Sequence, residues 1–125
     1  MKLTRICTGS DNQSHFEELD LPLRPSGRRA TSDPITTLGV GFSASDPLAP
    51  LDWHHAPRRQ IVAVLSGAFE IEVGDGSKRH FGPGDAFLAD DLAGQGHLTR
   101  DVGGPMRLLY IYLPDDFDPA PWRTG

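Results

Sequence analysis

Residues 60–85 read QIVAVLSGAFEIEVGDGSKRHFGPGD, and this stretch decides the fold class. Its first six residues are almost all aliphatic and β-branched, and the serine–glycine pair at 66–67 predicts a turn after them. Apolar and acidic side chains then alternate over residues 68–73, which is typical of a strand with one buried face. Glycine-rich turn signals follow at 74–76 and 82–85. The stretch therefore predicts short strands joined by tight turns.

Strand-like composition recurs on both sides of that stretch. Five further segments are expected to form strands, the first of them at a sheet edge: 2–8, 36–43, 86–89, 96–102 and 106–113. The connections between them are expected to be a polar turn at 9–14, an irregular arm at 21–33, a loop at 46–50 and a short helical turn near 115–118. About eight short strands at this spacing predict an all-β sandwich or barrel.

The composition bounds the class of protein. The chain has 125 residues, which fits one domain, and its 14 glycines and 11 prolines argue against a helical bundle. Twelve basic and 17 acidic side chains give a net charge of −5, which favours binding neither to nucleic acid nor to an anionic membrane. Hydrophobic residues are too dispersed for a membrane span, and residues 1–13 lack the apolar run of a secretory signal, so we expect a cytoplasmic protein. A single cysteine, Cys7, excludes an intrachain disulfide framework.

Two of the expected strands, at 61–65 and 108–113, are apolar on both faces. A strand with one face in water alternates between apolar and polar residues, so both faces of these strands are expected to be covered. One face then looks into a barrel, and the other meets the N-terminal arm or a second subunit. We therefore expect a homodimer.

Residues 53–60 read WHHAPRRQ and run directly into the first of these buried strands. His54 and Gln60 have the same parity along an extended chain, so they can face the same side. A second histidine, His97, begins a later strand. Two imidazoles and an amide oxygen that converge inside a barrel are able to hold a divalent metal.

These residues resemble two sequence motifs of the cupin superfamily. Gln60, six residues and Gly67 are similar to the second half of the first motif, which is His-x-His, a short spacer, Glu, six residues and Gly. Residues 82–88, GPGDAFL, followed by His97, resemble the second motif. The resemblance covers residues 53–113 and is closest to small single-domain bacterial cupins. It implies an all-β double-stranded β-helix, also called a jelly-roll barrel.

The resemblance also implies a metal site with an altered ligand set. His54 falls on the first metal histidine and His97 on the last, whereas Ala56 stands at the second histidine position and Gln60 replaces the glutamate. His55 is adjacent, but its parity points it away from the side that His54 faces. The expected cofactor is a divalent metal held by His54, Gln60 and His97, with Zn, Fe, Mn, Ni and Cu not distinguished. Because a neutral amide does little to offset a divalent charge, a metal-free pocket stays open as the alternative.

Four further residues are candidates for the chemistry. Asp91 stands where the small cupins carry an aspartate ahead of Gly-x-Gly-His; it can orient His97, act as a general base beside it, or cap loop amides. Arg58 can bind a substrate carboxylate, and the arginine after it points the other way along an extended chain. Tyr110 and Tyr112 share one parity, which points them either into the pocket or toward an interface.

Two functions are compatible with these residues. The first is an enzyme acting on a small organic carbonyl, carboxylate or phenolic substrate, as an oxygenase, isomerase or lyase, with His54, His97 and Asp91 as catalytic residues. The alternative is a non-catalytic carrier or sensor of small molecules with a metal-free pocket. In either case we expect one domain over residues 1–125: an N-terminal arm and first strands at 1–52, the two motifs at 53–113 and a tail at 114–125.

Overall fold

The computed structural model describes residues 1–46 and 51–123 of the chain. In chain order the elements are β1 (Lys2–Thr8), β2 (Ser14–Asp20), β3 (Arg24–Ser26), β4 (Arg29–Thr31), β5 (Gly39–Ser45), β6 (Leu51–His54), β7 (Gln60–Glu72), β8 (Lys78–Phe81), β9 (Ala86–Asp90), β10 (His97–Tyr112) and the short 3-10 helix η1 (Ala120–Trp122). The predicted all-β class is confirmed. The described residues contain no helix long and apolar enough to cross a membrane.

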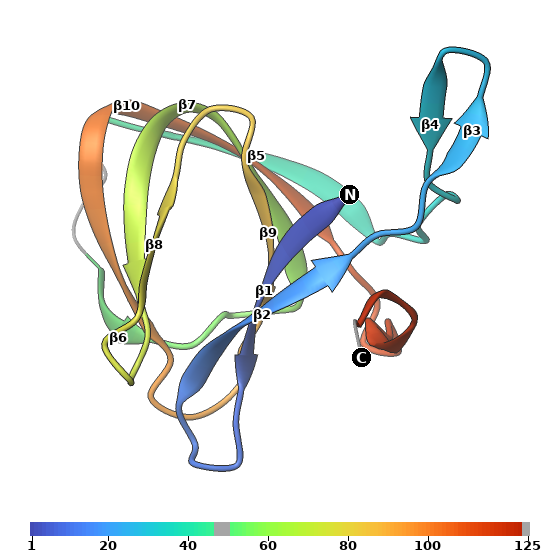
Figure 1. Ribbon diagram of the computed structural model, residues 1–125. Coiled ribbons are helices and arrows are strands. Elements are labelled where there is room, and N and C mark those ends of the chain that lie inside the picture. The colour runs from blue at the N-terminus through green and yellow to red at the C-terminus, as the bar shows by residue number, and fades with distance from the viewer. Residues whose placement is uncertain (47–50, 124–125) are drawn as a thin grey trace.

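Eight of these strands form one sheet that curls into a barrel (Figure 1). The order along the sheet is β2-β1-β9-β7-β10-β5, with β6 also pairing with β10 and β8 with β7. All of these pairs are antiparallel except β1–β9. The other two strands, β3 and β4, form a hairpin that projects away from the barrel (Figure 1).

The turn predicted at Ser66-Gly67 does not form, because β7 continues through it as one strand of 13 residues. Its neighbour β10 is likewise one strand of 16 residues and joins the two segments expected at 96–102 and 106–113. The pairing of the two strands shifts register beside Gly67, which has a φ of +80° and lies against the backbone of Pro105. This glycine therefore bends a long strand, and such bends allow a sheet to close into a barrel.

Two expectations about the first third of the chain are corrected. β1 is not an edge strand, because it lies between β2 and β9. The segment at 21–33 is not irregular throughout, because it holds the β3–β4 hairpin. The loop expected at 46–50 falls mostly on residues 47–50, which lie outside the described residues.

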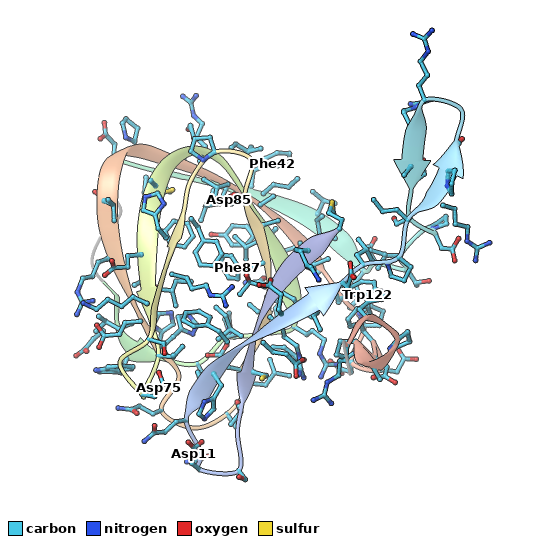
Figure 2. The ribbon with its side chains drawn as sticks, in the orientation of Figure 1. Asp11, Phe42, Asp75, Asp85, Phe87 and Trp122 are labelled. Atoms are coloured by element: carbon cyan, nitrogen blue, oxygen red, sulfur yellow. The ribbon has the colours of Figure 1, made fainter. Side chains whose placement is uncertain are left out.

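The main core fills part of the barrel interior. Its side chains come from strands on all sides, including the three mutually packed rings of Phe69, Phe81 and Phe87, and Figure 2 shows Phe87 within the barrel. The alternation over residues 68–73 is what places Phe69 and its i+2 neighbours on this inner face.

A second, smaller core lies on the outer face of the same strands. Its buried members are Leu3, Leu19, Ile61, Leu88 and Leu113. Phe117 and Trp122 from the C-terminal segment pack on it, with their rings edge to face and centroids 5.2 Å apart (Figure 2). The C-terminal segment thus covers part of the outer face that the sequence assigned to the N-terminal arm or a second subunit.

Candidate functional site

The barrel holds a cavity of about 420 Å³, a size suited to a small organic molecule. Apolar side chains of β7, β9 and β10 make up much of its lining: Val62, Phe69, Ile71, Phe87, Ala89 and Leu108. The polar lining consists of His54, Arg58, Gln60, His97, Thr99, Tyr110 and Tyr112. Six of the seven residues predicted from the sequence therefore line one cavity. The seventh, Asp91, lies behind His97.

His54 and His97 face each other across paired strands. They are directly opposite in the β6–β10 pairing, and their ring centroids lie 4.5 Å apart. Gly96 makes this approach possible, because it has a φ of +79° and a Cβ at this position would overlap the backbone of His54. The glycine before the second histidine thus sets how closely the two imidazoles meet.

Both imidazoles hold a proton on Nδ1. The Nδ1–H of His54 donates to the carbonyl oxygen of Asp52 at 2.7 Å, and that of His97 donates to Oδ2 of Asp91 at 2.6 Å. Neither Nε2 has a hydrogen-bond partner among the described residues. Both Nε2 atoms are therefore free to bond a molecule in the cavity.

Asp91 is fully buried and bonds side chains, not the backbone amides of its loop. Its Oδ2 also accepts a hydrogen bond from Oγ of Ser14 at 2.6 Å, while its Oδ1 is buried without a partner. Ser14 begins β2 and is also fully buried. Sequence reasoning missed Ser14, because nothing in its local sequence indicates that it meets a residue 77 positions later.

The two arginines after the histidines point in opposite directions, as their alternation predicts. Arg58 lines the cavity, and its guanidinium lies 4.6 Å from the ring centre of Tyr112. Arg59 turns to the other side, where its Nε donates to Asp90 at 2.6 Å. Arg58 is therefore the arginine available to a ligand.

The sequence left the facing of Tyr110 and Tyr112 open, and the structure places both at the cavity. Their rings are parallel within 2°, with centroids 6.5 Å apart. The neighbouring strand β5 makes room for them, because Gly41 lies against the Tyr112 hydroxyl and Ser43 bonds the Tyr110 hydroxyl at 2.9 Å. A side chain at position 41 would displace Tyr112.

Gln60 lines the cavity and is 8% exposed. Its amide has no hydrogen-bond partner among the described side chains and backbone groups, so it is free to bind a ligand. Ala56, at the position of the missing histidine, is buried in the lining. His55 does not replace it, because it is absent from the described lining, and its Nδ1–H donates to the carbonyl oxygen of Ala56.

These donors do not fit a resident divalent metal. Among the described residues, no third histidine, cysteine or carboxylate joins His54 and His97. None of the three candidate ligands supplies a negative charge, and the guanidinium of Arg58 adds a positive charge to the same cavity. A divalent ion there would have no anionic ligand from the described lining to offset its charge in a largely apolar setting.

The two motif-like segments meet at this one cavity. The first supplies His54 and Gln60, and the second supplies His97 at the start of β10, which is the arrangement the resemblance implied. The fold that brings them together is an all-β barrel formed by one curled sheet.

No protein-family model matches the chain, and no curated protein matches its sequence. Among solved structures, a protein from Neisseria meningitidis is similar over 62% of this chain and 78% of its own, with 18% identity and a TM-score of 0.47. A cupin 2 conserved barrel domain protein from Leptotrichia buccalis is similar over 91% of this chain, with 15% identity and a TM-score of 0.47; the chain spans 41% of that protein.

Proposed function

We propose that this cupin-like barrel binds a small organic acid and that its paired histidines transfer a proton on the bound molecule. The observation that carries this proposal is the charge of the cavity. Arg58 is the only formally charged side chain among the described residues that line it, and the rest of the lining is apolar or neutral. Such a cavity favours a ligand with one anionic group and an apolar body.

Arg58 is placed to bind the anionic group. Its stacking on Tyr112 holds the guanidinium plane at the cavity, and no described carboxylate forms an ion pair with it. The N–H donors of Arg58 therefore remain available for a carboxylate or phenolate. The phenylalanine, isoleucine and leucine side chains of the lining bury the apolar body, at about 25 cal/mol per Å² removed from water.

The two histidines supply general acid–base catalysis. His97 accepts a proton from a C–H or O–H of the substrate on Nε2, while Asp91 holds the Nδ1 proton and balances the charge that the ring gains. Because the ring of His54 lies 4.5 Å away, both imidazoles reach the same small molecule. The proton can then return to a neighbouring carbon, which is the chemistry of an isomerase, or pass to a β-oxygen that leaves as its C–O bond breaks, which is the chemistry of a lyase.

A non-catalytic carrier is the second candidate. It is favoured by the absence of carboxylate and thiol groups from the described lining, which leaves the two imidazoles as the reactive groups. The two candidates share the binding mode and differ in whether the bound acid is changed.

Binding is tested by thermal unfolding with a panel of aryl and branched aliphatic carboxylates and their methyl esters. At ten times its Kd an acid stabilises the fold by about 1.4 kcal/mol, or about 5 °C in Tm, and its ester does not. Arg58→Ala abolishes the shift, whereas Arg107→Ala, an exposed arginine outside the cavity lining, keeps it. Esters that stabilise as well as acids, or stabilisation that disappears with EDTA, would contradict the proposal.

Proton transfer is tested by NMR in D2O with 2-oxo acids that bind. The enzyme hypothesis predicts protein-dependent loss of the C–H signal beside the carbonyl. His97→Gln stops this exchange and His80→Gln, an exposed histidine on β8, does not. Binding without exchange for every acid that binds would leave the carrier as the function.

A further inference from the structure

A second groove, of about 400 Å³, lies outside the barrel at the base of the β3–β4 hairpin. It is lined by Leu21, Pro22, Asp33, Pro34, Ile35, Thr36, Pro114, Asp116, Phe117 and Trp122. Its charged lining groups are two carboxylates, Asp33 and Asp116, and its aromatic side is the edge-to-face pair of Phe117 and Trp122. Carboxylates beside aromatic rings form a site for a guanidinium or an ammonium group.

The β3–β4 hairpin has the opposite character. All six residues of its two strands are exposed, and it projects from the barrel without packing against it (Figure 1). A two-stranded hairpin by itself is at best marginally stable in water. Arg24 pairs with Asp33 at 3.0 Å, but Arg28 and Arg29 at the turn have no ion pair among the described residues. The hairpin therefore presents two unpaired guanidinium groups at its tip.

We propose that two copies of this chain form a dimer in which the hairpin tip of each copy docks in the outer groove of the other. The groove lies at the base of the hairpin and the free arginines lie at its tip. When two hairpins lie antiparallel about a two-fold axis, each tip reaches the other's base, so both contacts form together. Within one copy the hairpin projects away from the barrel and from the C-terminal segment (Figure 1).

Charge complementarity selects a second copy as the occupant. Asp116 is exposed and has no ion pair among the described residues, and Asp33 keeps its second oxygen free beside Arg24. Arg28 or Arg29 of the other copy satisfies these carboxylates and stacks on Trp122. An exposed apolar side chain follows the groove in the chain: Leu38, two residues after Thr36 and directly before β5, is 72% exposed. A copy seated in the groove lies beside Leu38 and shields it from water.

Light scattering during size exclusion at about 50 μM in low salt tests this dimer. The parent protein elutes with the mass of two chains. Reversing the tip charges, with Arg28→Glu and Arg29→Glu together, weakens the dimer at least about a hundredfold and gives a folded monomer, because both side chains are exposed and neither forms an ion pair within its own copy among the described residues. Arg107→Glu, an exposed arginine on β10, leaves the dimer intact.

The decisive test reverses the charge of Asp116 in the groove. Asp116→Arg alone gives a monomer, and Asp116→Arg combined with the two tip substitutions restores the dimer. A parent protein that is monomeric overturns the proposal. Tip variants that remain dimeric overturn it too, and they place the interface elsewhere, for example on the exposed apolar side chains of β5. Failure of the restored variant to dimerise while it stays folded by circular dichroism also overturns it.

Discussion

Asp90 and Asp91 are neighbours in the chain and are both buried, yet the molecule uses them in opposite ways. Asp90 points toward two arginines, and both of its oxygens are engaged: Oδ2 accepts from Nε of Arg5 at 2.9 Å and lies 2.7 Å from Nη2 of the same arginine, and Oδ1 accepts from Arg59 at 2.6 Å. Asp91 points the other way, toward His97 and Ser14, and engages one oxygen only.

The partners of Asp90 show that it holds the fold together. Arg59 also donates to the carbonyl oxygens of Asp115 and Phe117, so it ties the C-terminal segment to the barrel. Burial lowers the pKa of Arg5, but hydrogen bonding to Asp90 and its charge outweigh this and raise the pKa above the usual value. Each partner of Asp90 is therefore a structural cation with a satisfied counterion.

Asp91 differs from Asp90 in that its side-chain partners, His97 and Ser14, include no arginine. A fully buried carboxylate with one unpartnered oxygen is costly for a fold. The cost is understandable if the charge serves His97 during proton transfer, as we propose. Both carboxylate oxygens of Asp90 accept from arginines, whereas Asp91 lies beside the imidazole of His97 and has one oxygen without a partner. Substitution by asparagine distinguishes these two situations.

The largest effect is expected for Asp90→Asn. The asparagine side chain has one oxygen and one NH2 group, so its NH2 group must face the N–H donors of either Arg5 or Arg59. Both of these largely buried arginines also lose their counterion. We expect a loss of about 3 kcal/mol of unfolding free energy and a fall in Tm of about 10 °C. Asp20→Asn, at an exposed ion pair with Lys2, serves as the control and leaves Tm unchanged. A destabilisation of less than about 1 kcal/mol for Asp90→Asn would show that the arginines find water instead.

Whether a feature of the fold or of the site could be predicted from the sequence depended on how far apart in the chain the interacting residues lie. The alternation over residues 68–73 identified an inward face, because period-two geometry is local. His54 and Gln60 line one cavity, but residues 55–59 between them are not in a strand, so their shared parity does not explain it. The bend at Gly67 looked like a turn, since the strand continues only because β10 bends with it. That partner begins 30 residues later, at His97.

The orientation of the site's supporting residues required the fold. Tyr110 and Tyr112 were undecided because parity fixes that two residues share a side, and only the neighbouring strand fixes which side. The glycines of β5 that admit the rings are about 70 residues away. Ser14 was missed altogether, because its partner Asp91 is reached through the parallel β1–β9 pairing and not through any local pattern.

An intermediate effect is expected for Ser14→Ala. This substitution removes a 2.6 Å hydrogen bond to a buried carboxylate and leaves Asp91 with His97 as its only described partner. The expected loss is about 1.5 kcal/mol, read from chemical denaturation with an unchanged m-value. Ser43→Ala, which loses a bond to Tyr110 at an exposed position, is the matched control and costs less. Equal losses for the two variants would mean that Ser14 contributes no more than a surface hydroxyl.

The smallest effect on stability is expected for Asp91→Asn, although Asp91 is more deeply buried than Asp90. The amide oxygen can take the place of Oδ2 and accept from both Ser14 and His97, while the NH2 group occupies the position of the unpartnered Oδ1. Both bonds become weaker without the charge, but the burial of a charge is also relieved, so we expect a change within about 1 kcal/mol.

Asp91→Asn also separates the binding of an acid from proton transfer. The variant should keep the stabilisation by carboxylates, because Arg58 and the cavity lining are untouched, and the Nδ1–H tautomer of His97 should persist in imidazole nitrogen NMR spectra. Exchange of substrate protons should fall sharply, since no carboxylate then balances the charge on His97. A loss of stability as large as that of Asp90→Asn would show that Asp91 is, like its neighbour, a structural counterion, and would remove the physical reason for its placement behind His97.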